Sequence, residues 1–313
     1  MKIPEQFLSE LKSAGLLRSL RNVECLPGGM ARMEDGREVV NLASNDYLGL
    51  AHHPALVEAF ARGARDGGAG AMASRLVTGT RRVHSGLEEA LAELKGTEAA
   101  VSFSSGYATS VGVIASIADG NDTVVMDKLS HASLIDGARL SGARLATFLH
   151  NDMDSLRRKL EHARRVNPAG GILVVTESVF SMDGDRAPLR ELVRLKDEFG
   201  ALLLVDEAHG FGVLACSRAW ADVMINSARS LIYSTAPPPA LAAAALAAVR
   251  IISGEEGKAW RRHVSALAEA LSAALGTPGR PVSSIFPVVI GENEAALSAA
   301  QRLLEQGFLA PAI

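Results

Sequence analysis

Short apolar segments alternate with helical segments between residues 85 and 205, and this alternation constrains the fold more than any other feature of the chain. Strands are expected at residues 99–103, 123–126, 144–148, 171–176 and 201–205. Helices are expected at residues 85–95, 106–118, 131–140, 154–166 and 189–199. Strands that are apolar throughout, without a two-residue alternation, are typical of sheets buried on both faces. The pattern therefore predicts an α/β fold with a mostly parallel sheet flanked by helices.

The alternation stops after Ala215, and prolines at residues 237–239 then interrupt the chain. Beyond them, the sequence predicts a helix at residues 240–252, a strand at residues 286–290 and a helix at residues 294–306. These elements indicate a second, smaller α/β unit. We expect an N-terminal arm over residues 1–42, a large domain over residues 43–235 and a small C-terminal domain over residues 236–313.

The composition argues against several classes of protein. With 48% hydrophobic and 21% charged residues, the chain has the make-up of a globular protein and not of a disordered one. Lys and Arg number 32 against 35 Asp and Glu, so there is no basic surplus to bind a nucleic acid. The longest apolar run, residues 236–249, contains prolines and is too short to cross a membrane. Two cysteines and no signal-peptide core at the start favour the cytoplasm.

Polar residues follow four of the expected strands. They are Ser104-Ser105-Gly106-Tyr107, Ser130-His131, Glu177-Ser178 and Asp206-Glu207-Ala208-His209. In doubly wound sheets, ligands bind beyond the carboxyl ends of the strands. These positions are therefore the candidates for chemistry.

Two interpretations are open for the first of these segments. Gly106 and Tyr107 begin a helix, whose free N–H groups could bind a phosphate. The serines before them could equally serve as helix caps.

Asp206 ends an apolar strand, so its carboxylate needs a positive or hydrogen-bonding partner or a solvated position. One partner would be the protonated ring nitrogen of a pyridine cofactor. Another would be magnesium, as in the Walker B box of a helicase, but the GxxxxGK[ST] loop that a helicase requires is missing from the sequence.

His131 and His209 could each stack on an aromatic ligand or transfer a proton near neutral pH. A helix cap or a surface position would explain either histidine as simply. No pair of histidines or cysteines has the spacing of a zinc site, so a metal is not expected.

Taken together, the segments resemble the α-oxoamine synthases, which are pyridoxal-phosphate (PLP) enzymes of aminotransferase fold type I. The matching segments are NLASNDYLGL at residues 41–50, SRLVTGT at 74–80, HSGLEE at 84–89, FSSGY at 103–107, SHASLIDGAR at 130–139, HND at 150–152, TESVFSMDGD at 176–185, DEAHG at 206–210 and YST at 233–235. The resemblance is strongest to the branch that condenses L-alanine with a pimeloyl thioester, carried by coenzyme A or acyl carrier protein, in biotin biosynthesis. A sister enzyme that acylates glycine is the alternative within the family.

The resemblance implies a role for each matched position. Gly106 and Tyr107 would lie near the cofactor phosphate, and His131 would stack over the pyridine ring. Asp206 would hold the ring nitrogen protonated. The remaining roles are a hydrogen bond from Ser178 to the cofactor, a contact of His209 with the ring oxygen, and an acyl-substrate contact by Arg18. The family also implies a homodimer with the active site at the subunit boundary.

Two departures from the family pattern stand out. The Ser/Thr-x-x-Lys motif, whose lysine carries the cofactor as a Schiff base, is missing where Leu214-Ala215 runs directly into Cys216. The family also continues beyond Ile313 to further substrate-binding residues. A truncated chain that is not an enzyme is therefore a third hypothesis, and both domains would be incomplete.

Overall fold

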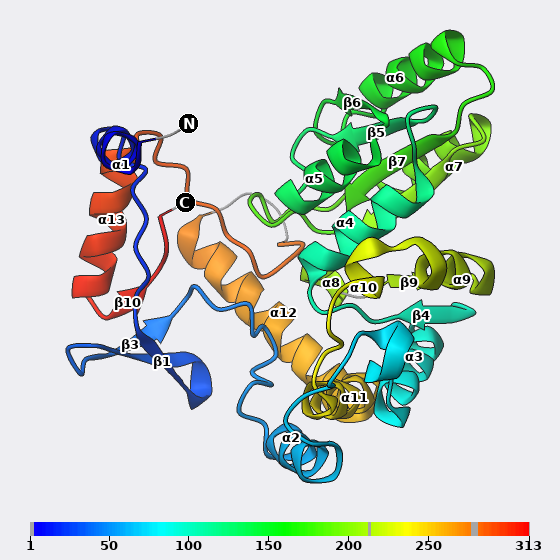
Figure 1. Ribbon diagram of the computed structural model, residues 1–313. Helices are drawn as coiled ribbons and strands as arrows, with labels where there is room; N and C mark the ends of the chain where they lie inside the picture. The colour runs from blue at the N-terminus through cyan, green and yellow to red at the C-terminus, as the bar shows by residue number, and fades with distance from the viewer. Residues whose placement is uncertain (1–2, 212–213, 277–280, 313) are drawn as a thin grey trace. The chain divides into compact units, whose positions relative to one another are not determined.

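The computed structural model describes residues 3–211, 214–276 and 281–312. The chain forms two compact units (Figure 1). The first combines the N-terminal segment up to His53 with the C-terminal segment from Pro287, and the second covers Pro54–Phe286. Every candidate residue except Arg18 lies in the second unit.

A four-stranded parallel sheet lies between helices of the second unit (Figure 1). Its order is β6 (Arg144–Phe148), β5 (Thr123–Asp127), β7 (Ile172–Glu177) and β8 (Leu202–Asp206). β5 and β7 are buried along their whole length, as their largely apolar sequences predict. The predicted parallel sheet is confirmed.

Alternate residues of these strands pack into two different cores. Val125 and Val174 face α6 (Met153–Val166) and α7 (Leu189–Glu198), whose leucines complete the first core. Val124 and Leu173 face α4 (Gly106–Ile117) and α5 (Ala132–Ser141). Each fully buried aliphatic side chain stabilises the fold by roughly 1.5–3 kcal/mol. The helix layers therefore fix the sheet from both sides.

α4 and α5 approach closely at Gly137. A Cβ atom built there would lie 2.9 Å from the Ser110 carbonyl oxygen and 3.2 Å from Ile114 Cβ. A glycine at this point of α5 allows the two helices to pack at short distance. This packing sets the position of the first turn of α4, which carries Tyr107.

β8 is an edge strand of the four-stranded sheet. Within the described ranges, it pairs with β7 alone. β4 (Ala99–Val101) and β9 (Leu214–Cys216) form a separate antiparallel pair. Leu204 of β8 packs in one core with Val101 and Leu214 of that pair. In the part of the chain that the structure describes, the two sheets are therefore joined by side-chain packing and not by a hydrogen-bonded ladder.

Helices surround this pair of sheets. α3 (Arg82–Lys95) ends at Gly96, as predicted, with that glycine in the left-handed region (φ 66°). α11 (Pro239–Ser253) packs Ala242 and Val249 against α3. The other helical elements are α2 (Pro54–Gly67), η2 (Arg75–Gly79), α8 (Ala208–Phe211), α9 (Arg218–Ser227), α10 (Arg229–Ile232) and α12 (Glu255–Leu275).

The first unit is a small sheet with helices. Its strands lie in the order β1 (Val23–Leu26), β2 (Met30–Met33), β3 (Glu38–Asn41) and β10 (Phe308–Leu309), and β10 runs parallel to β3. The remaining elements are α1 (Pro4–Ser13), η1 (Pro27–Gly29) and α13 (Asn293–Glu305). Ala31, Val39 and Leu304 form its core, which joins the two ends of the chain.

Two features differ from the sequence predictions. The strand expected at residues 286–290 is wrong, because these residues have no regular structure and Val289 is 90% exposed. Pro287 also lacks a backbone N–H for a ladder. The bounds of the two compact units also differ from those of the three expected segments. α11, which was expected in the small C-terminal domain, packs on α3, and β3 near the N-terminus pairs with β10 near the C-terminus.

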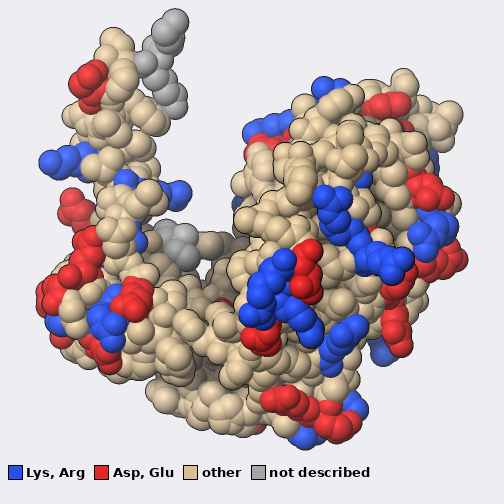
Figure 2. All heavy atoms as spheres, turned by 60° about the horizontal axis from the view of Figure 1, so that its bottom comes forward, with Lys and Arg blue, Asp and Glu red and all other residues tan. Residues whose placement is uncertain are grey.

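Basic and acidic side chains lie intermixed on the face shown in Figure 2. The ion pairs of the chain include Arg157–Glu198 and Arg65–Glu58. Among the described helices, none combines the length and the apolar character that a membrane span requires.

Candidate functional site

The candidate site lies at the carboxyl edge of the parallel sheet, where three polar segments are tied together. Glu177 and Asp206 stand opposite each other in the β7–β8 register. The Ser178 N–H donates to the Asp206 carbonyl oxygen at 2.7 Å. The His131 N–H donates to Glu177 Oε1 at 2.6 Å. The structure therefore brings together four positions that are separated in the sequence.

His131 precedes the first residue of α5 and caps that helix. Its Nδ1 accepts the Ser133 N–H at 3.2 Å and lies 2.7 Å from Ser133 Oγ. The interpretation of His131 as a cap is thus confirmed. These contacts orient the exposed ring and leave Nε2 without a partner among the residues described. The nitrogen that remains is available to a ligand.

Asp206 and His209 lie at the end of β8 and in α8. Asp206 is half-buried, and its Oδ1 accepts the Ala208 N–H at 2.8 Å. Burial lowers the pKa of His209; the charge of Asp206 opposes this shift, and His131 adds to it. The charges of Asp206 and His131 therefore both act on His209.

Glu177 is a functional candidate to which the sequence analysis gave no role. It is 3% exposed. Burial raises its pKa to about 7, the charges of Asp206 and Asp127 act in the same direction, and the N–H groups of His131 and Ser181 oppose them. An acidic residue at the end of a fully apolar strand was the available signal. Its meaning depends on the register with Asp206, which the sequence does not show.

Two serines at this edge carry buried hydroxyl groups that lack a partner. The Oγ atoms of Ser178 and Ser130 are buried, and neither has a hydrogen-bond partner among the described residues. Buried polar atoms are rarely left in this state unless a ligand or water completes them. The edge therefore has unused hydrogen-bonding capacity next to His131 and Asp206.

The start of α4 contributes Gly106 and Tyr107. Ser105 Oγ accepts the Ala108 N–H at 3.1 Å, which confirms the cap interpretation for this segment. No atom lies within 4 Å of the position that a Cβ on Gly106 would occupy, so the space beside it is open. The Tyr107 hydroxyl donates to Asp136 at 2.9 Å, and this bond raises its pKa. The exposed first turn retains N–H groups that could receive an anion.

Comparison with known proteins decides the family. The sequence profile of "Aminotransferase class I and II" matches residues 37–215. The 8-amino-7-oxononanoate synthase of Geobacter sulfurreducens is 43% identical, over 96% of this chain and 86% of its own length. The protein of the same name from Alkalilimnicola ehrlichii is 42% identical, over 98% and 87%. The chain belongs to the aminotransferase class I and II family.

Solved structures of this family agree with the fold. A structure named SPT with a PLP internal aldimine has a TM-score of 0.86 and 26% identity, covering 98% of this chain and 88% of its own. A lysine-to-alanine variant of serine palmitoyltransferase from S. paucimobilis, with a bound PLP–myriocin aldimine, has a TM-score of 0.85 and 25% identity, covering 98% and 89%. The predicted PLP-dependent fold type I is confirmed.

The described residues fit the PLP of this family. The unpartnered hydroxyl group of Ser178, the open space beside Gly106 and the free Nε2 of His131 lie around Asp206 or at the adjacent helix start. A carboxylate at Asp206 suits a protonated pyridine nitrogen. Arg18 is exposed and belongs to the first unit, so its role stays a prediction.

The relatives contain residues that this chain does not have. The alignment with the Geobacter sulfurreducens protein extends over 340 positions, more than the 313 residues of the chain. The family match ends at residue 215, the position where the sequence analysis places the missing lysine motif. Lys95 forms an ion pair with Glu207, the residue after Asp206. Glu207 lies between the end of β8 and the start of α8.

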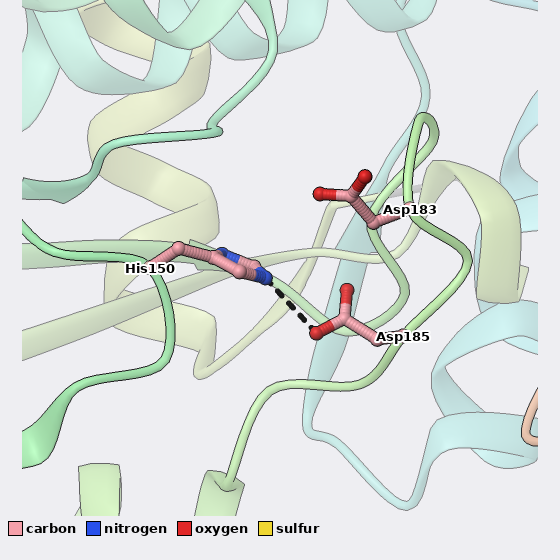
Figure 3. Close-up of side chains that lie close together, drawn as sticks. All are labelled: His150, Asp183 and Asp185. Atoms are coloured by element: carbon pink, nitrogen blue, oxygen red, sulfur yellow. Dashed lines mark hydrogen bonds and ion pairs between the residues drawn. The ribbon is translucent and has the colours of Figure 1, made fainter. Parts of the chain in front are cut away.

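His150, Asp183 and Asp185 come together on the loops after β6 and β7 (Figure 3). Their nearest ligand atoms lie within 4.8 Å of one another, a group that the sequence analysis did not predict. Both ring nitrogens of His150 are occupied: Nδ1 lies 3.0 Å from Asp127 Oδ1, and Nε2 lies 2.9 Å from Asp185 Oδ2. We interpret these contacts as an ion-pair network, called the clamp below, in which His150 joins Asp127 at the end of β5 to Asp185 on the loop after β7. Burial lowers the pKa of His150, but the bonds to Asp127 and Asp185 outweigh it and raise the pKa.

Proposed function

We propose that the chain is an 8-amino-7-oxononanoate synthase, which joins L-alanine to a pimeloyl thioester with loss of carbon dioxide and of the thiol carrier. The observation that carries this proposal is the convergence of His131, Ser178 and Asp206 at one sheet edge. Relatives of that name are 39–43% identical over nearly the whole chain. The reaction is a PLP-dependent acyl transfer.

When bound, PLP would supply a positively charged ring that withdraws electrons from the substrate carbon. Asp206 would accept a hydrogen bond from the ring nitrogen and hold its proton. The exposed ring of His131 would cover the pyridine and exclude water. Ser178 and His209 would bind polar atoms of the ring, and the first turn of α4 would receive the phosphate. Arg18 would contact the acyl substrate.

A second candidate is a chain that binds PLP and amino acid without turnover. It is favoured by the family match ending at residue 215, where the sequence analysis expects the lysine motif to be missing. A Schiff-base lysine serves both as anchor and as proton-transfer base, so its loss would lower turnover by orders of magnitude.

The test is an assay of the purified chain with PLP and pimeloyl-CoA, offering L-alanine and glycine separately. The proposal predicts product with alanine and a change in the visible PLP spectrum when alanine is added. A spectral change without product supports the second candidate. Product with glycine alone would identify the sister acyltransferase. An unchanged spectrum with either amino acid would contradict all of these functions.

We further propose a homodimer in the cytoplasm. An apolar surface supports the dimer: Met72, Val77 and Tyr233 are 82%, 73% and 72% exposed. The bridge between Ser74 and Thr235 holds these segments side by side. A second copy would bury this surface. Sedimentation should give a dimer for the chain and a monomer for Val77→Glu.

The proposed cytoplasmic location is supported by the two cysteines, Cys25 and Cys216, which are both free, as expected in a reducing compartment.

A further inference from the structure

Glu177 lies on the same face of the sheet as Asp206. Leu173 and Val175 of β7 pack in the core beneath α4 and α5, and Leu204 of β8 packs against that core. Side chains two residues apart on a strand share a face. Glu177 and Asp206 continue these two rows and are paired in register. The two carboxyl groups therefore face the same layer at the sheet edge.

Within the described residues, Glu177 is bonded by backbone donors and forms no ion pair with a basic side chain. His131 donates its N–H at 2.6 Å, and the N–H of Ser181 is a second donor. Asp206 on β8 is the titratable group paired with it in register, and the charge of Asp127 on β5 acts on it from the opposite face of the sheet. His131 at the start of α5 contacts it through the backbone N–H. His209 on α8 is coupled to them through Asp206. A buried carboxyl group without a cation is costly when ionised.

We propose that Glu177 is a positioning residue of the PLP site: its buried carboxyl group fixes His131 at the sheet edge and couples its charge to that of Asp206, its partner in register. This inference rests on the proposed function for the identity of the ligand. The hydrogen bond from the His131 N–H to Glu177 fixes the position of the imidazole ring relative to the end of β7. The proton on Glu177 removes the repulsion between two carboxylates that are paired in register.

The protonation of Glu177 is then linked to the charge of the ligand. Its pKa of about 7 means that both protonation states exist near neutral pH. A ligand that brings a positive ring nitrogen to Asp206 should stabilise the ionised form of Glu177 and release its proton. PLP binding should therefore change with pH across a step near 7.

The experiment compares Glu177→Gln and Glu177→Ala with the full-length chain. Glu191→Gln on the surface of α7 is the matched control for charge. The first readout is hydrogen exchange of the His131 amide by NMR, which needs no cofactor. We expect at least about tenfold faster exchange in Glu177→Ala and near-normal exchange in Glu177→Gln, because Gln retains the acceptor oxygen. Exchange unchanged in Glu177→Ala would overturn the positioning role.

The second readout is the dissociation constant of PLP from pH 5.5 to 8.5. The chain and Glu191→Gln should show the step near pH 7, and Glu177→Gln should lose it while keeping the His131 amide protected. A purely structural role would leave the pH profile unchanged, and a step that persists in Glu177→Gln would overturn the charge role. If the chain fails to bind PLP at any pH, the proposed function fails and so does the charge role. The exchange readout still decides the positioning role in that case.

Discussion

Ser178 donates its N–H to the carbonyl oxygen of Asp206 over 2.7 Å, at the point where β7 and β8 end together. This bond holds the backbone of Asp206 even though β8 has no neighbour on its other side in the described structure. Position and charge at Asp206 can therefore be tested separately, because a change of its side chain leaves the backbone bond in place.

Asp206→Asn should weaken PLP binding by about tenfold or more, which corresponds to roughly 1.4 kcal/mol, since a charge-assisted hydrogen bond to the ring nitrogen would be lost. Absorbance titration with PLP measures the effect, and circular dichroism should show an unchanged fold. Glu207→Gln is the control: it removes the neighbouring carboxylate that pairs with Lys95. Equal losses in both variants would contradict the role of Asp206.

The parallel sheet and the location of the site were accessible from the sequence because both depend on local patterns. β5 and β7 are apolar except at their ends, Asp206 is the last residue of β8, and His131 lies four residues after β5. The role of Glu177 was not accessible, because it arises from pairing with a residue on another strand. The predicted strand at residues 286–290 failed because an apolar run alone does not provide a pairing partner.

Glu177→Gln should also change how stability depends on pH. Burial raises the folded-state pKa of Glu177 from 4.5 to about 7. The wild-type chain therefore loses stability as pH rises through this interval, on the order of 3 kcal/mol at most. The neutral Gln cannot ionise. The unfolding free energy of the variant, relative to that of the wild type, should therefore rise up to about pH 7 and stay constant above it. Urea unfolding at pH 5 and pH 8 measures the difference, and an equal difference at both would contradict it.

His150→Asn should remove the clamp between Asp127 and Asp185. Burial lowers the His150 pKa, but the two carboxylates outweigh it and raise the folded-state value. The clamp should therefore stabilise the fold fully below the unfolded value of about 6.5 and weaken as pH rises through the folded value. Thermal unfolding of the variant and of His162→Asn, a surface control, should diverge at pH 6 and converge at higher pH. Constant divergence would indicate loss of packing alone.

The expected absence of the family's lysine motif leads to a direct chemical prediction. Borohydride reduction of the chain with one equivalent of PLP should give no stoichiometric pyridoxyl adduct at a single lysine, while dialysis before reduction should remove the cofactor. Lys128 is exposed beside the site and Lys95 is paired with Glu207, so peptide mapping should cover both. A full-occupancy adduct on either lysine would show that another amine takes over the anchoring role.

Gly137→Ala tests whether the close packing of α4 and α5 supports the site. The new methyl group would lie 2.9 Å from the Ser110 carbonyl oxygen and 3.2 Å from Ile114 Cβ, so α4 must shift. We expect a loss of about 1–3 kcal/mol in unfolding free energy, although alanine is the better helix former.

Gly86→Ala in α3 is the matched control, because its methyl group would meet Leu246 at an ordinary 3.7 Å. That variant should be neutral or more stable by about 0.5–1 kcal/mol. Since α4 carries Tyr107 at the phosphate end of the proposed site, Gly137→Ala should also weaken PLP binding, and Gly86→Ala should not. Equal stability in both variants would show that the two helices have room to move apart without cost.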